Sequence, residues 1–158
     1  MASTQPMSGS PHGGHVVVDA ARLWGGGLAT ACVAALVAVV GVLVFGVVLG
    51  VSLVRPALLL DVASTFTADY ALTAFLLGLI ATAVAHGLAL TTPRPRLFFS
   101  WIVGLATVAG VATPFAIGSA LESQASTAAI NLFLGVAVLS LLRGVMSRTV
   151  SIAAGRTP

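Results

Sequence analysis

Residues 23–54 read LWGGGLATACVAALVAVVGVLVFGVVLGVSLV, a run of 32 residues without one charged side chain. Three further runs of this kind follow at residues 70–93, 97–121 and 123–142. A helix needs about 20 apolar residues to cross a bilayer core of about 30 Å. A helix also satisfies its own backbone hydrogen bonds, which lipid cannot do. The four runs therefore predict an all-α fold, an integral membrane bundle of four helices.

The composition agrees with lipid as the main solvent of this chain. Apolar residues make up 58% of it and charged residues 7%, where a soluble domain carries about 25% charge. We expect one membrane domain at residues 22–150, between a disordered tail at 1–21 and a short tail at 151–158. The expected spans are 24–50, 69–91, 97–118 and 126–147. The basic residues are few and flank these spans, so we expect the lipid bilayer as a partner and no nucleic acid.

The arginines predict the orientation. Six of them fall on one side of a chain that crosses four times: Arg22, Arg94, Arg96, Arg143, Arg148 and Arg156. The other side has Arg55 alone. By the positive-inside rule we expect both termini in the cytoplasm and the protein in the cell membrane. All seven cations are arginine and the chain is rich in Ala, Val, Gly and Leu, a bias expected of a bacterial source, so this membrane would be a bacterial inner membrane. Aromatic residues are expected as interface anchors, with Trp24, Phe98, Phe99 and Trp101 inside and Tyr70 outside.

Local signals mark the ends of the spans. The pair Arg55-Pro56 is expected to stop helix 1, because proline lacks an amide donor and restricts the residue before it. The sequence Thr92-Pro93-Arg94-Pro95 predicts a tight turn between helices 2 and 3. Ser126 is a candidate N-cap for helix 4. The apolar loop at residues 51–68 is expected to lie on the bundle or in the interface, with room for one short helix.

The chain also shows an internal similarity. Trp24-x-x-Gly-Leu-Ala-Thr is repeated at Trp101, 77 residues later, and Leu-Gly at Gly78 is repeated at Gly135, 57 residues later. The longer first loop absorbs the difference between the two offsets. The similarity predicts two tandem parallel hairpins related by an axis along the membrane normal.

Polar residues at membrane depth are candidates for function. Pro114 frees the carbonyl of Gly110, and Asn131 or Thr113 is expected to take it up. Together with Asp69 and Glu122 as a roof, Asn131, Thr113 and Pro114 form a candidate outer polar layer. One interpretation is a helix–helix hydrogen bond worth about 0.6–2 kcal/mol; the other is a shallow ligand pocket open to the outside.

Other chemistry has little support in the sequence. His86 is the candidate inner polar residue, as a proton relay or as a side chain that reaches the headgroups. The single cysteine, Cys32, is expected to be a small packing residue. No catalytic set, cofactor motif or metal-ligand spacing is found, so we expect no enzyme, no cofactor and no metal site.

The pattern resembles a family of uncharacterised four-span membrane proteins common in actinobacteria, a domain of unknown function. The likeness covers roughly residues 22–150. It rests on the glycine-rich start of helix 1, on Ala112-Thr113-Pro114 and on Ile130-Asn131-Leu132-x-x-Gly135. The resemblance implies the four-span fold and no specific activity.

Two functions remain open from the sequence. The first is a non-enzymatic structural or accessory subunit of a membrane assembly, because the chain has few residues outside its spans. The alternative is a small oligomeric transporter of a small or lipophilic solute. Small multidrug transporters also have four short spans, but they depend on a glutamate in helix 1, where this chain offers only Thr30 and Cys32.

Overall fold

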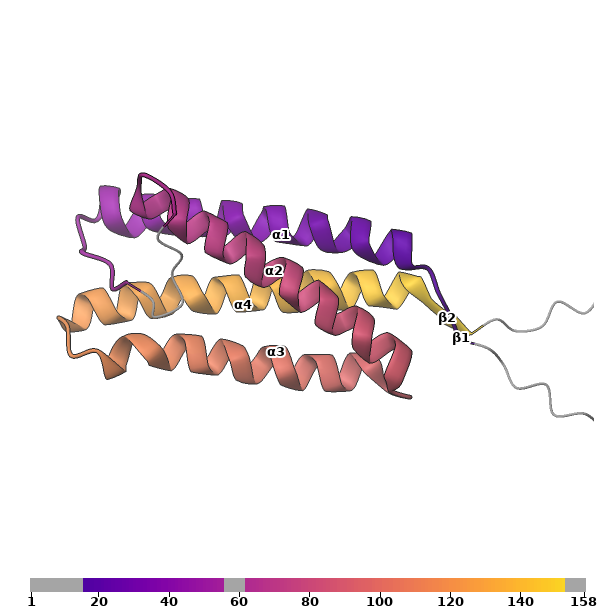
Figure 1. Ribbon diagram of the computed structural model, residues 1–158. Helices are drawn as coiled ribbons and strands as arrows, with labels where there is room; N and C mark the ends of the chain where they lie inside the picture. Colours follow the sequence, from indigo (N-terminus) through magenta and orange to yellow (C-terminus); the bar gives the residue numbers. More distant parts are fainter. Residues whose placement is uncertain (1–15, 56–61, 153–158) are drawn as a thin grey trace, which may run out of the picture.

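The computed structural model describes residues 16–55 and 62–152. Four long helices lie side by side and alternate in direction (Figure 1). They are α1 (Ala20–Val42), continued by the π-helical turn η1 (Leu43–Val48), α2 (Phe66–Thr91), α3 (Pro95–Ala112), continued by the 3-10 turn η2 (Thr113–Ala116), and α4 (Leu121–Thr149). The predicted all-α bundle is confirmed.

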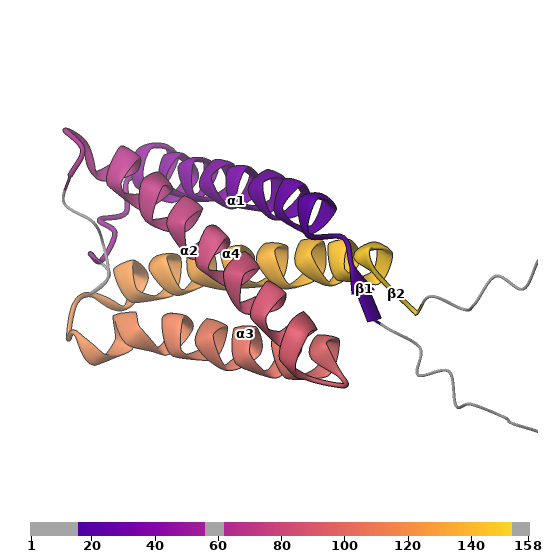
Figure 2. The same ribbon diagram turned by 45° about the vertical axis from the view of Figure 1, so that its right-hand side comes forward.

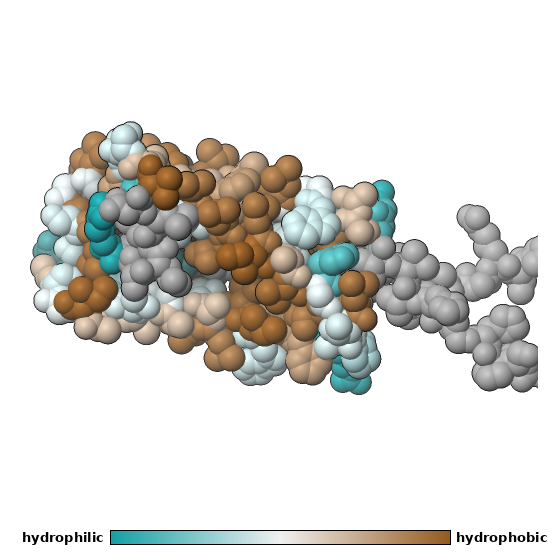
Figure 3. Space-filling view, in the orientation of Figure 1, coloured by the Kyte–Doolittle hydropathy of each residue, from teal (hydrophilic) through white to brown (hydrophobic). Residues whose placement is uncertain are grey.

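Each helix is long and apolar enough to cross a membrane. The spans are Ala20–Val48, Phe66–Thr91, Pro95–Ala116 and Leu121–Arg148. On the face shown in Figure 3, apolar residues form a belt around the middle of the bundle and most hydrophilic residues lie at its two ends. This distribution is the one that an integral membrane bundle requires, because water contacts only the ends.

A short β-ribbon joins the two ends of the described chain. Strand β1 (Val16–Val18) pairs antiparallel with β2 (Val150–Ile152), Val17 lying opposite Ser151. Residues 16–18 were expected to be disordered, as part of the tail at 1–21, and the structure corrects this. The two strands pair because α1 and α4 are neighbours, which brings two short runs rich in β-branched residues together at one end of the bundle. The rest of both tails lies outside the described residues. We call this end of the bundle the ribbon end and the opposite end the loop end.

Helix 1 ends at a glycine and not at the Arg55-Pro56 pair. Its last turn is π-helical, with the Leu49 amide donating to the Val44 carbonyl at 3.0 Å. Gly50 follows with φ +64°, a left-handed conformation that glycine adopts at no steric cost. The helix therefore ends close to residue 50, the expected end of the first span, and the Arg55-Pro56 pair lies beyond its end.

The connections at the other helix ends follow the sequence more closely. Thr65 caps α2 by accepting from the Ala68 amide at 3.3 Å. Pro95 is the first residue of α3, where its missing N–H is not needed. The expected N-cap at Ser126 was wrong, because α4 already begins at Leu121, more than one turn earlier.

The loop after α1 packs on the bundle, as expected. The Val54 amide donates to the Thr127 hydroxyl of α4 at 3.0 Å, and both residues are buried. The short helix that the sequence analysis allowed in this loop overlaps residues 56–61, which lie outside the described residues.

Small residues bring α1 and α2 into close contact. A Cβ atom added to Gly78 would lie 2.8 Å from the Ala31 backbone, and one added to Gly27 would overlap the Thr82 side chain. Thr82 itself is fully buried, with its hydroxyl bonded to the Gly78 carbonyl at 2.9 Å. We call this contact the α1–α2 seam. It closes because small side chains let two membrane helices approach.

The second hairpin has a similar close contact. Gly135 of α4 packs against the Thr107 side chain of α3, again with no space for a Cβ. Gly104, the counterpart of Gly27 at the offset of 77, has no such neighbour. The two hairpins therefore share one glycine contact and differ in another, and the predicted duplication stays a prediction.

The two hairpins do not close against each other along their full length. Helix α2 packs mainly on α1, and α3 mainly on α4. Figure 2 shows α2 crossing in front of α4, near α3 at the ribbon end and near α1 at the loop end. The divergence of α2 from α3 leaves α4 as the floor between them.

Two expected interface anchors, Phe99 and Tyr70, are instead buried. Trp24, Phe98 and Trp101 are exposed as anchors should be, but Phe99 is 0% exposed and belongs to the core with Leu23. Cys32, expected to pack inside, is exposed. In a span that is apolar all round, the sequence does not mark which face turns inward.

Candidate functional site

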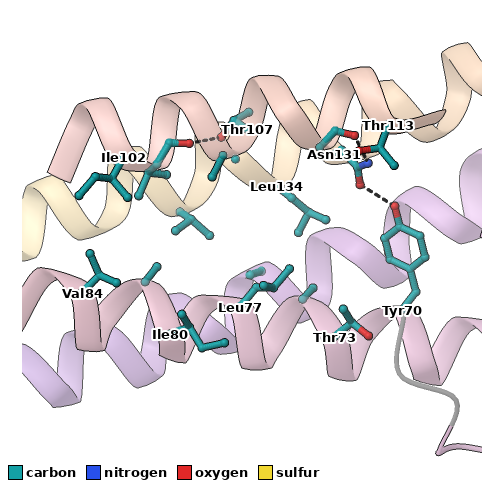
Figure 4. Close-up of a pocket in the computed structure, with 18 residues that line it drawn as sticks. Tyr70, Thr73, Leu77, Ile80, Val84, Ile102, Thr107, Thr113, Asn131 and Leu134 are labelled. Carbon is teal, nitrogen blue, oxygen red and sulfur yellow. Dashed lines mark hydrogen bonds between the residues drawn. The ribbon is translucent and has the colours of Figure 1, made fainter. Parts of the chain in front are cut away.

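A cleft opens between α2 and α3 where the two helices diverge. Its cavity volume is about 340 Å³. Residues of all four helices line it, and Figure 4 shows its walls and floor. One wall comes from α2 between Tyr70 and Val84, the other from α3 between Ile102 and Thr113, and the floor comes mainly from α4. The cleft is thus a product of helix arrangement and not of any single segment.

The mouth of the cleft lies on the apolar surface of the bundle. Its rim includes Leu77, Ile80 and Ile102, which are 49%, 58% and 45% exposed. These side chains lie in the middle of their spans, where the surrounding medium is lipid. The cleft therefore opens sideways into the bilayer rather than to water.

One end of the cleft is polar. The Asn131 amide nitrogen donates to the Gly110 carbonyl of α3 at 2.7 Å. This is the carbonyl that Pro114, four residues later, cannot bond through an amide. The predicted contact between Asn131 and helix 3 is therefore confirmed. It forms because an unpaired amide at this depth would cost several kcal/mol.

Tyr70 completes the polar end of the cleft, a role that was not expected from the sequence. Its hydroxyl donates to the Asn131 side-chain oxygen at 2.7 Å, so the pair links α2 to α4 (Figure 4). Tyr70 is only 3% exposed and is not an interface anchor. Its one signal in the sequence is that it is the single tyrosine of the chain.

Three threonines contribute hydroxyls to the cleft. Thr113, near the polar end, donates to the Ala109 carbonyl at 2.7 Å, and Thr107, farther along α3, donates to the Val103 carbonyl at 2.7 Å. Thr73 donates to the Asp69 carbonyl at 2.7 Å. Each of these hydroxyl protons is used within its own helix, so toward a ligand the oxygens act as acceptors.

The expected roof does not form over the polar end. Asp69 is buried, but its carboxylate accepts the amides of Val62 at 3.0 Å and Ala63 at 2.6 Å. It therefore holds the loop before α2 and does not line the cleft. Glu122 is exposed in the first turn of α4. Neither carboxylate reaches Asn131, because both side chains lie above it at the loop end.

His86 lies outside the cleft, in the half of α2 near the ribbon end. Its ring centroid is 6.3 Å from that of Trp24, with the rings tilted by 56°. The Nδ1 atom is buried without a hydrogen-bond partner among the described residues. His86 is thus packed between α1 and α2, and the structure does not join it to Asn131.

The described residues contain no group of three or more His, Cys, Asp or Glu side chains that could hold a metal ion. The cleft itself offers hydrogen bonding from an amide, a phenol and hydroxyls, next to a long apolar surface.

Comparisons with known proteins give one match. No curated protein and no solved structure matches the chain significantly. A model of a family of unknown function, DUF6069, matches residues 18–148, which contain all four spans and both ends of the cleft. The chain therefore belongs to the DUF6069 family.

Proposed function

We propose that this membrane protein is not an enzyme and that it binds a lipophilic molecule in the cleft between α2 and α3. The observation that carries the proposal is the cleft itself: an apolar cavity of about 340 Å³ that opens toward lipid and has polar groups at one end. Ligand pockets are mostly apolar, about 300–1,000 Å³ in volume, with a few polar groups that fix orientation.

The polar groups support binding rather than catalysis. A nucleophile needs a nearby base to activate it. Among the described residues that line the cleft, the polar groups are hydroxyls and one amide, and no side chain is a histidine, cysteine or carboxylate. The three threonine hydroxyls donate to backbone carbonyls. They are suited to hold a ligand in place.

A photoactivatable hydrocarbon, an alkyl diazirine, tests this proposal in purified protein in lipid nanodiscs. Ala106 and Ala109 are both exposed alanines of α3, but only Ala106 lines the cleft. We expect Ala106→Trp to fill the cleft and abolish labelling of its walls. Ala109→Trp is the matched control and should label like the wild type. Equal labelling of cleft residues in both variants would contradict the proposal.

A second candidate function is an accessory subunit of a membrane assembly. It is supported by how little of the described chain lies outside the spans: the connections at residues 92–94 and 117–120 are very short. Pull-down of the tagged protein in mild detergent tests this candidate: a stoichiometric partner supports the accessory role, whereas a homo-oligomer supports a small transporter.

We further propose that the protein lies in the cell membrane with the ribbon end in the cytoplasm. Of the six arginines among the described residues, five lie toward the ribbon end and Arg55 alone at the loop end. In a Cys32→Ser background, an impermeant thiol reagent added outside intact cells should label Ser119→Cys and not Pro93→Cys. The reverse pattern would contradict the orientation.

A further inference from the structure

We propose that the ligand of the cleft is a neutral, single-chain lipid alcohol, with its hydroxyl against Asn131 and its chain along α2 and α3. This inference rests on the proposed function and narrows it to one chemical class. It depends on three properties of the cleft: its dimensions, its lack of charge and the hydrogen-bonding capacity that its polar end leaves unused.

The dimensions fit one chain. Along α2 the lining extends from Tyr70 to Val84, about 21 Å at 1.5 Å per residue. The volume of about 340 Å³ is near the lower limit of about 300 Å³ for ligand pockets. A cavity that is long and small in volume is narrow, so it suits a single extended chain better than the two chains of a phospholipid.

The lining excludes an ionised head group. Among the described residues, the cleft is lined by apolar side chains, hydroxyls and the Asn131 amide, without an arginine or carboxylate. An ion moved from water to such a site loses its hydration and gains no opposite charge, which is very costly. A phosphate, an ionised fatty acid or an ammonium head is therefore unsuitable, and a neutral head is favoured.

The hydrogen-bond inventory selects a hydroxyl among neutral heads. The protons of the Tyr70 and Thr113 hydroxyls are already donated to protein oxygens, at 2.7 Å each. Both oxygens keep lone pairs that can accept. Asn131 uses its amide group on the Gly110 carbonyl, and a side-chain amide has a second N–H to donate.

The polar end therefore offers acceptors together with one donor. An alcohol both donates and accepts, so it can use both kinds of group at once. An ether or a ketone only accepts, and it would leave the lone pairs of Tyr70 and Thr113 without a donor. The head group should lie at this end because Tyr70, Thr113 and Asn131, the groups that can bond it, lie together there.

The route to this site is through the bilayer. The rim residues Leu77, Ile80 and Ile102 are about half exposed and belong to membrane-spanning segments. Toward the loop end, the Tyr70–Asn131 hydrogen bond joins α2 to α4, the helix that forms the floor of the cleft. A lipid alcohol would therefore enter sideways between α2 and α3 and place its chain toward Val84 and Ile102 (Figure 4).

Three photoactivatable probes test the inference on the full chain in nanodiscs: a diazirine-bearing hexadecan-1-ol, its methyl ether and the matching hexadecanoic acid at neutral pH. We expect the alcohol to label the cleft walls about tenfold more than the ether, because an unmet hydrogen bond costs about one power of ten in affinity. The ionised acid should label them still less, because its charge meets no opposite charge in the cleft. Excess unlabelled hexadecan-1-ol should remove the alcohol signal.

Variants locate the recognition. Asn131→Leu should lower labelling by the alcohol and by the ether alike, because both accept from the Asn131 amide. Thr113→Val should lower labelling by the alcohol alone, because it removes an acceptor of the alcohol proton. Thr91→Val is the control, because Thr91 is exposed near the ribbon end and its hydroxyl also bonds a carbonyl of its own helix. The comparison of probes on the wild-type protein stands even if Asn131→Leu fails to fold.

Each other outcome is decisive. Equal labelling by alcohol and ether, or preference for the acid, would overturn the inference and leave the proposed lipophile-binding function intact. Absence of cleft labelling by all three probes, together with the alkyl diazirine, would overturn both. Alcohol labelling that persists in Ala106→Trp at the wild-type level would show binding elsewhere and overturn the inference.

Discussion

The two sides of helix α2 meet their neighbours in opposite ways. On the side toward α1, the residues are small: Gly78 packs on the Ala31 backbone, and Thr82 packs against Gly27. On the side toward α3, Leu77 and Ile80 stand at the rim of an open cleft. Both sides are apolar, so hydropathy does not separate them. The difference teaches that side-chain size decides where membrane helices close and where they stand apart.

The largest expected effect separates the core from the cleft by removing a leucine from each. Leu23 is fully buried in the core, whereas Leu77 is 49% exposed at the cleft rim. We expect Leu23→Ala to lower the free energy of unfolding by about 2–5 kcal/mol and Leu77→Ala by less than about 0.5 kcal/mol. Thermal unfolding in mild detergent measures both. Similar losses would mean that the cleft is closed in solution.

A somewhat smaller effect is expected from enlarging a glycine of the α1–α2 seam. A side chain on Gly78 collides with the Ala31 backbone, whereas Gly87 on the same helix has nothing within 4 Å. Gly78→Leu should therefore destabilise by about 1–3 kcal/mol through overpacking. Gly87→Leu is the matched control and should be neutral or slightly stabilising. If both variants unfold at the same temperature, the seam is not the close contact described here.

The smallest expected effect concerns the polar end of the cleft. Asn131→Leu removes the bonds to Gly110 and Tyr70, and such a bond in a membrane is worth about 0.6 kcal/mol on average. We expect a loss of about 1 kcal/mol in the free energy of unfolding. Tyr70→Phe should cost less and should add almost nothing in the Asn131→Leu background, because the two residues share one bond. Full additivity in this double-mutant cycle would show that the Tyr70–Asn131 bond contributes nothing.

Much of this structure could be predicted from the sequence, because helices that span lipid must be long and nearly free of charged residues. Charge-free runs of sufficient length specify the four spans, and two prolines specify the turn at residues 92–95. The contact of Asn131 with Gly110 followed from Pro114, because a freed carbonyl and an amide at one depth each need a partner.

The rest depended on information that these runs do not contain. A span that is apolar all round carries no stripe to show which face is buried, so Phe99 and Cys32 were assigned to the wrong surroundings. Tyr70 was assigned to the interface because aromatic residues usually lie there, but a partner 61 residues away keeps it inside. The cleft itself arises from the angle between two helices, which no local pattern specifies.

Lipid access to the cleft is the central claim, and fluorescence quenching measures it directly. In a Trp24→Phe, Trp101→Phe background, a single tryptophan replaces Leu77 at the cleft rim, Leu76 on the outer surface of α2, or Leu88 against the core. Lipids brominated in their chains quench only tryptophans that they touch. We predict that Leu77→Trp is quenched as strongly as Leu76→Trp and far more than Leu88→Trp. Quenching of Leu77→Trp no stronger than that of Leu88→Trp would contradict an open cleft.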